Sequence, residues 1–161
     1  MKRFDQAEFR QALGKFATGI TVVTTTGKNN TPLGVTVNSF TSVSLEPPLV
    51  LWCLDLNANC YDEFANCDSF AIHVLHKSQE ATSRNFAENN GDKFADIDWK
   101  TGDSGSPVLQ DCAVCLQCKT EQIYSGGDHS ILLGRVEIIE SFNDADPLIY
   151  HGGAYRFLQN K

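Results

Sequence analysis

Short segments rich in β-branched and apolar residues, separated by turn-forming residues, limit the fold more than any other feature of this sequence. Residues 20–26 are almost all Ile, Val and Thr, whose branched side chains favour the pleated surface of a strand. A Gly-Lys-Asn-Asn turn follows at 27–30, and 33–39 is extended again, so the pair predicts a β-hairpin. Further strands are predicted at 49–54, 69–75, 112–124 and 130–142, with two short ones in the tail.

Three helices are predicted around these strands, at residues 5–15, 57–66 and 78–89. The apolar residues of the first helix fall near one of its faces: Phe4, Phe9, Leu13 and Phe16. Ser78 is the expected N-cap of the third helix, because a hydroxyl can accept a hydrogen bond from the first free backbone N–H groups.

The order of these elements predicts a mainly β fold. No long alternation of strand and helix suggests a doubly wound parallel sheet. We expect an antiparallel sheet that closes into a small β-barrel with a few peripheral helices, because closure removes exposed strand edges. The apolar run LVLWCL at 49–54 predicts a strand buried on both faces, and the Gly-, Asp- and Ser-rich segment 91–107 predicts a long surface loop.

The chain has 161 residues, a length that suits a single domain spanning 1–161. It carries 20 acidic against 13 basic residues, a formal net charge of −7, and no run of three basic residues. Nucleic acids and anionic membranes are therefore poor partners, because phosphate binding requires clustered Lys and Arg. No apolar stretch is long enough to cross a bilayer, and the N-terminus lacks the apolar core of a signal peptide. We expect a cytoplasmic protein.

Six cysteines raise the question of a metal or redox site. Cys112-x-x-Cys115-x-x-Cys118 has the spacing of iron–sulfur ligands, but no fourth thiolate follows, and a strand would turn Cys115 away from the other two. Free cysteines are more often buried as small hydrophobes, and we expect this of all six. His73 and His76 would not converge on one metal ion, so no metal site is predicted.

Two polar motifs are candidates for ligand binding. The segment Asn38-Ser39-Phe40-Thr41-Ser42 follows a predicted strand, and its hydroxyls and backbone N–H groups suit a polar planar ligand or a phosphate. The same composition also occurs at ordinary strand ends. Gly127-Asp128-His129 is either a turn with a ligand-facing histidine or a simple hairpin corner.

The two motifs belong to a longer series that runs through nearly the whole chain. It comprises FATGITVVT at 16–24, TVNSFTSVSLEPPLV at 36–50, FAIHVL at 70–75, SRNFA at 83–87, GDKF at 91–94, GDHSILLGRV at 127–136, and PLIY at 147–150 with Tyr155. In this order and spacing the series resembles the flavin reductase family, which consists of short-chain NAD(P)H:flavin oxidoreductases.

The resemblance implies a fold, an activity and a partner. The fold would be the closed antiparallel FMN-binding split β-barrel of Greek-key type, in a homodimer. The activity would be reduction of FMN or FAD by NADH or NADPH, a hydride transfer between stacked rings that needs no nucleophile or metal. The reduced flavin would pass to a partner monooxygenase.

The resemblance also implies which residues form the site. The isoalloxazine would lie against Thr36, Asn38, Ser39, Phe40, Thr41 and Ser42 and against the backbone of Cys53, Leu54 and Asp55. Phe86 and Ala87 would lie near the ribityl phosphate. His129 and Tyr155 would lie on the nicotinamide side, where His129 would be the catalytic residue, either as a donor to the reduced ring or as a group that positions the carboxamide.

The chain departs from the family at one place. Where the family commonly has a Ser-x-Thr pair that binds the flavin phosphate, this sequence has Ala58-Asn59-Cys60 and so lacks two hydroxyls. Backbone N–H groups at a helix start near Asn57, with Asn59 as one further donor, are the expected substitutes. The departure keeps open an alternative function, a flavin-binding electron-transfer or sensor protein without reductase turnover. A cysteine-based metal protein is a third and weaker alternative.

Overall fold

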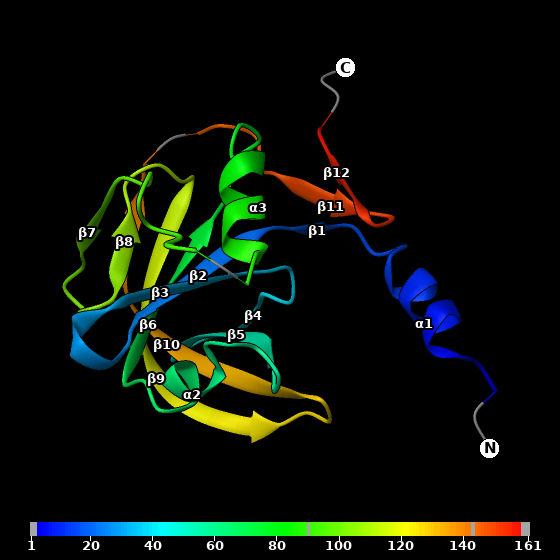
Figure 1. Ribbon diagram of the computed structural model, residues 1–161, viewed down its shortest axis with the longest axis horizontal. Coiled ribbons are helices and arrows are strands. Elements are labelled where there is room, and N and C mark those ends of the chain that lie inside the picture. The colour runs from blue at the N-terminus through cyan, green and yellow to red at the C-terminus, as the bar shows by residue number, and fades with distance from the viewer. Residues whose placement is uncertain (1–2, 90, 143, 159–161) are drawn as a thin grey trace.

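A seven-stranded antiparallel sheet forms the body of the structure, a computed structural model that describes residues 3–89, 91–142 and 144–158 (Figure 1). In sheet order the strands are β3 (Pro32–Val37), β2 (Thr21–Thr26), β6 (Ser69–Val74), β9 (Val114–Ser125), β10 (His129–Ser141), β5 (Pro48–Asp55) and β4 (Thr41–Leu45). The expected hairpin is formed by β2 and β3, and the expected mainly β fold is confirmed.

Smaller elements lie around this sheet. β1 (Thr18–Gly19), β11 (Ile149–His151) and β12 (Ala154–Arg156) form a second sheet, and β7 (Trp99–Thr101) pairs with β8 (Pro107–Leu109). The helices are α1 (Gln6–Leu13), α2 (Tyr61–Ala65) and α3 (Glu80–Ala87), with a 3-10 turn η1 at Lys28–Asn30. No helix in the described part of the chain has the length and apolar character needed to span a membrane.

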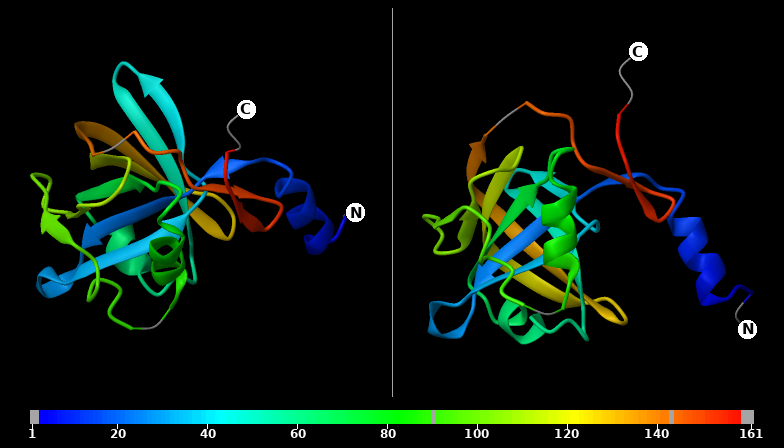
Figure 2. Two further views of the ribbon diagram at one scale, coloured as in Figure 1. Left: turned by 90° about the horizontal axis from the view of Figure 1, so that it is seen from above. Right: turned by 45° about the horizontal axis from the view of Figure 1, so that its top comes forward.

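The sheet is curved, and the β4–β5 hairpin projects from it (Figure 2). In the described residues no strand ladder joins the edge strand β3 to β4 or β5, so strand pairing alone leaves the sheet open. A side chain links the two sides instead: the Ser39 hydroxyl accepts from the Cys53 backbone N–H at 2.9 Å and donates to the Cys53 carbonyl at 3.2 Å.

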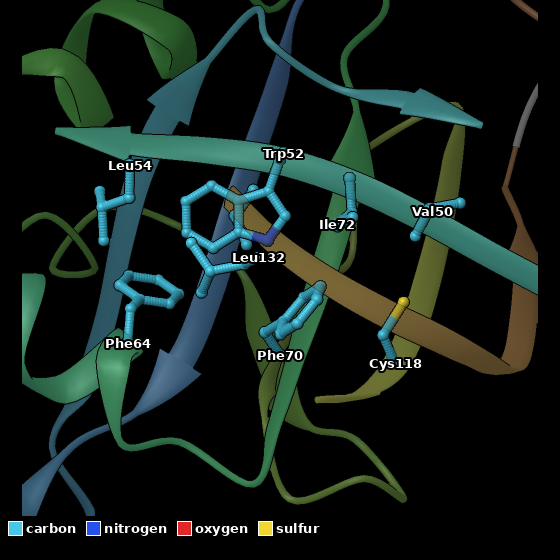
Figure 3. Close-up of a cluster of buried hydrophobic side chains, with 9 residues drawn as sticks. Val50, Trp52, Leu54, Phe64, Phe70, Ile72, Cys118 and Leu132 are labelled. Carbon is cyan, nitrogen blue, oxygen red and sulfur yellow. The ribbon is translucent and has the colours of Figure 1, made fainter. Parts of the chain in front are cut away.

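Trp52 on β5 is the centre of the main apolar core (Figure 3). Its indole meets the rings of Phe64 from α2 and Phe70 from β6 edge to face, with centroids 5.1 and 5.8 Å apart. Each such pair adds about 0.5–1.5 kcal/mol to the burial of the rings. The contacts hold α2 against one end of the sheet, although α2 has only five residues.

Burial along β5 differs from the prediction for 49–54. Val50, Trp52 and Leu54 are buried, but the residues between them, Leu51 and Cys53, are only half-buried. An antiparallel strand alternates its side chains between two faces, and the outer face of β5 is not covered as a parallel sheet would be. The prediction that this strand is buried on both faces is therefore wrong.

The cysteines with metal-ligand spacing are packing residues, as predicted: Cys112, Cys115 and Cys118 are all buried. The same prediction is wrong for Cys53, Cys60 and Cys67, which are only half-buried. Cys115 and Cys118 lie in different apolar clusters. Burial raises the pKa of Cys112 and of Cys118 to about 12, so both thiols are protonated at neutral pH.

The helix predictions hold in position but not in detail. Gln79, not Ser78, is the N-cap of α3, and its side chain makes no capping bond. α2 begins at Tyr61 rather than near Asn57, because the Asp55 carboxylate accepts a hydrogen bond from the Asn57 N–H at 2.8 Å in a turn after β5. The expected surface loop at 91–107 contains β7 and the start of β8, and the sequence reading missed β1 and β4.

His73 on β6 forms hydrogen bonds to two other strands, β2 and β8, inside the molecule. It is fully buried; its Nε2 accepts from the Leu109 N–H at 3.1 Å, so its Nδ1–H donates to the Val22 carbonyl at 3.0 Å. This arrangement requires the neutral ring. Burial lowers the pKa of His73 to about 4.

The His73 contacts predict that the free energy of unfolding falls as pH drops from about 6.5 to about 4. In that range the unfolded chain binds a proton at His73 and the folded chain does not, a difference on the order of 3 kcal/mol. Urea unfolding at a series of pH values measures it. His73→Gln should flatten this slope, whereas the half-buried His151→Gln should keep it; equal slopes in all three proteins would contradict the assignment.

Candidate functional site

A cavity with a volume of about 620 Å³ lies between the end of α3, strand β3, the segment 58–60, Asn89 and the segment 91–94. Phe86, Phe94 and Trp99 form an aromatic wall, in which successive ring centroids are 5.1 and 5.6 Å apart. Asn59 and Lys93 contribute polar groups to the lining. A cavity of this size and lining suits a ligand with an apolar ring and an anionic group.

A second cavity of about 240 Å³ lies on the other side of the α3 end, and Ala87 lines both. Its other lining residues include Thr36, Asn38 and Tyr155. The Tyr155 hydroxyl is 2.9 Å from the Ser83 hydroxyl. This bond and the neighbouring aromatic Tyr150, whose ring centroid is 5.8 Å from that of Tyr155, fix the phenol at the cavity.

The position of α3 follows from a close approach to β3. A Cβ at Gly34 would lie 2.5 Å from the Phe86 ring, so only glycine allows this packing. The Thr36 hydroxyl donates to the Ser83 carbonyl at 2.7 Å. Lys93 reaches both elements, donating to the Gly34 carbonyl at 3.2 Å and to the Phe86 carbonyl at 3.0 Å. Burial lowers the pKa of this half-buried ammonium.

The segment that departs from the family, Ala58-Asn59-Cys60, lines the larger cavity. The Asn59 amide donates one N–H to the Asn89 carbonyl at 3.2 Å, and its second N–H is the remaining donor of that group. The expectation that backbone N–H groups near Asn57 would hold a phosphate is wrong. Asp55 already accepts from the Asn57 N–H with its carboxylate and from the Ala58 N–H with its carbonyl.

The side chains of the predicted polar segment 38–42 lie in several different environments. Asn38 lines the smaller cavity, whereas Ser39 uses its hydroxyl to link the segment to Cys53. Phe40 packs against the main core, and Thr41 and Ser42 lie exposed on the edge strand β4.

His129 begins β10 and lies across the strand ladder from Asp55. Its Nδ1 is 2.8 Å from the carboxylate of the exposed Asp128, and its side chain is 42% exposed. Hydrogen bonds from Asn57, and to a lesser degree the charge of His129, lower the pKa of Asp55. His129 lines neither of the two cavities.

The structure therefore brings together six of the predicted site residues at the end of α3: Thr36, Asn38, Asn59, Phe86, Ala87 and Tyr155. The other eight do not line these cavities: Ser39, Phe40, Thr41, Ser42, Cys53, Leu54, Asp55 and His129. Leu54 points its side chain into the core, so only its backbone is available to a ligand.

Sequence reasoning missed Lys93 and Trp99. Lys93 lies in the GDKF motif, which had no role assigned to it, although a cation within a family motif of an acidic chain was a usable signal for an anionic ligand. Trp99 follows this motif, in the segment expected to be a long surface loop, and no individual residue of that segment was assigned to the site outside the motif.

The chain is similar in sequence to several known proteins. An FMN reductase (NADH) of Agrobacterium fabrum is 44% identical over 147 residues, which cover 91% of this chain and 83% of the relative. The reductase subunit of a flavin-dependent monooxygenase of Rhodococcus jostii is 36% identical over 94% of this chain and 77% of its own. A probable flavin reductase of Rhizobium meliloti is 42% identical over 94% of this chain, which spans only 49% of that relative.

Among solved structures, an NADH:FAD oxidoreductase of Streptomyces globisporus, in complex with NAD and FAD fragments, superposes with a TM-score of 0.91. It is 38% identical, and the match covers 96% of this chain and 93% of that one. The family model described as flavin reductase like domain matches residues 13–159. The chain therefore belongs to the flavin reductase family.

Proposed function

We propose that the protein is an NAD(P)H-dependent flavin reductase acting as one domain over 1–161. The observation that carries this proposal is the pair of adjoining cavities that share Ala87, one with an aromatic wall and a cation, the other with Thr36, Asn38 and Tyr155. A flavin has matching parts, a ring with polar edges for the smaller cavity and an anionic phosphate for the cation of the larger one. When bound, it accepts a hydride from the reduced nicotinamide.

In this reaction the residues of the chain bind the flavin and orient it. Lys93 and Asn59 supply donors to the phosphate end in the larger cavity, and Thr36 and Asn38 supply polar groups near the ring. Tyr155 lies on the nicotinamide side of the smaller cavity. The hydroxyl bonds between Ser39 and Cys53 support closure of the sheet as a split barrel, because they join the chain after β3 to β5. We assign the protein to the cytoplasm and a monooxygenase as recipient of the reduced flavin; the Rhodococcus relative supports the partner.

A second candidate is a flavin-binding electron-transfer or sensor protein without turnover. The observation in its favour is the absence of hydroxyls at Ala58 and Cys60, both of which line the larger cavity. This candidate requires tightly held flavin, and therefore a yellow protein after desalting.

Steady-state oxidation of NADH and NADPH by the purified protein tests the two candidates. The reductase requires oxidation that increases with added FMN or FAD and saturates. Desalted protein without added flavin serves as the control. A yellow protein with no flavin-dependent turnover would favour the second candidate.

His129 is proposed to act on the nicotinamide side of the bound flavin. It lies across the ladder from Asp55, on the strand pair that carries the backbone of 53–55. His129→Ala should lower kcat about tenfold or more, because the loss of a donor to the developing charge slows the reaction. The flavin Kd, measured by fluorescence, should stay within about twofold of wild type.

Asp128→Asn is the matched control for the His129 experiment, since it keeps the turn and removes only the exposed carboxylate 2.8 Å from the histidine. It should lower kcat much less than His129→Ala. Equal losses of kcat and flavin affinity in His129→Ala would assign the residue to a structural corner.

A homodimer is the oligomeric state that we propose. The apolar face of α1 and its flanks, Phe4, Phe9, Leu13 and Phe16, is exposed, and the helix lies away from the main sheet (Figure 1). Val43 and Leu45 on the projecting β4 are exposed as well. Apolar groups gathered in this way mark an interaction surface, and a second copy supplies the same surfaces in return.

Light scattering should give twice the 17.8 kDa mass of one chain. Replacing both Leu13 and Phe16 by Asp should give the monomer, because charge at a buried interface is costly. Ile139→Ser, which changes an exposed apolar residue on β10, should leave the dimer intact. A wild-type monomer at micromolar concentration would overturn this proposal.

A further inference from the structure

The larger cavity exceeds what the phosphate of a flavin mononucleotide requires. The proposed function places the ring on the side of Thr36 and Asn38 and the phosphate near Ala87, where the two cavities meet. A phosphate fills only a small part of this cavity of about 620 Å³, whose lining continues to Phe94 and Trp99. Ligand cavities of roughly 300–1,000 Å³ enclose whole drug-sized molecules, so this space accommodates a further large group.

The wall of the cavity suits a flat ring. Phe86 is fully buried, Phe94 is nearly so, and Trp99 is 37% exposed at the outer end of the series. The Phe94 and Trp99 rings meet at 70°, edge to face. One face of an indole that is not covered by its aromatic neighbour is a stacking surface for a base.

The one cation at the cavity, among the residues that the structure describes, is available to a diphosphate. Of the cavity's described lining residues only Asp92 and Lys93 carry a charge, and the Asp92 carboxylate accepts from the Phe94 N–H at 3.0 Å. Lys93 uses two of its three N–H groups on the Gly34 and Phe86 carbonyls, one residue from Ala87. Its ammonium is therefore held in the larger cavity beside the residue that precedes Ala87, which lines both cavities.

We propose that the larger cavity binds the adenosine monophosphate half of FAD, so that the protein prefers FAD to FMN, with Lys93 at the diphosphate and Trp99 stacked on adenine. Adenosine phosphate is also part of NADH. We assign the cavity to FAD because it adjoins the flavin phosphate position at Ala87 and Asn59. The inference rests on the proposed function; family membership does not decide it, since relatives include an FMN reductase and an FAD reductase.

Equilibrium binding of FAD, FMN and riboflavin to the flavin-free protein, followed by flavin fluorescence without nicotinamide, tests the proposal. FAD should bind about 10- to 100-fold more tightly than FMN, the range expected from one stacked base. Trp99→Ala should remove most of this difference and leave the FMN Kd within about twofold. Trp99→Phe should restore a large part of the preference, because a phenyl ring also stacks.

Lys100→Gln is the matched control, since Lys100 lies next to Trp99 on β7 but pairs with Glu140 at 3.2 Å instead of lining the cavity. It should leave all three flavin affinities unchanged, and unchanged FMN binding by Trp99→Ala shows that this variant is folded. Equal affinities of the wild type for FAD and FMN would overturn the proposal. So would a Trp99→Ala variant that binds NADH more weakly but keeps its FAD affinity.

These outcomes are separable from a failure of the proposed function. A protein that prefers FAD but oxidises no nicotinamide would retain the adenosine site and lose the reductase assignment. A protein that turns over FMN and FAD and binds both equally would retain the reductase assignment and lose the adenosine site.

Discussion

The packing of Phe86 against the backbone of Gly34 determines where the candidate site lies. Because Gly34 has no side chain, the end of α3 approaches β3 closely enough for the ring to rest on the strand. This contact puts Ala87 between the two cavities and brings the Gly34 and Phe86 carbonyls within reach of one lysine, Lys93. A bulkier residue at 34 would displace the helix and the lining of both cavities together.

The other side of the larger cavity depends on the main core. Phe64 of α2 packs edge to face on Trp52, so a five-residue helix with little intrinsic stability is held by a tertiary contact. The segment 58–60 precedes that helix and is placed opposite α3 as a result. The rigid sheet thus supports a site built mostly from the connections between its strands.

Much of the fold followed from local patterns. The β-branched run at 20–26 and the two long segments around 127–129 formed antiparallel pairs because their strand preference and turn residues agree. The prediction that 49–54 is buried on both faces was wrong, because composition does not determine what covers the outer face of a strand. The prediction of Ser78 as N-cap was wrong because α3 begins one residue later, with Gln79 as its N-cap. The Gln79 side chain donates to the Asp111 carbonyl and does not cap the helix.

For this protein the sequence alone determined the local β preference, the order of the family motifs and the buried role of Cys112, Cys115 and Cys118. Only the tertiary structure decided which motif residues meet. It placed Asn59 in the larger cavity and Tyr155 in the smaller one, with Ala87 lining both. It left His129 outside both cavities and gave Lys93 and Trp99 a place in the larger one. The reason is physical: strand pattern and turn chemistry act over a few residues, whereas a cavity arises where close packing of distant elements stops.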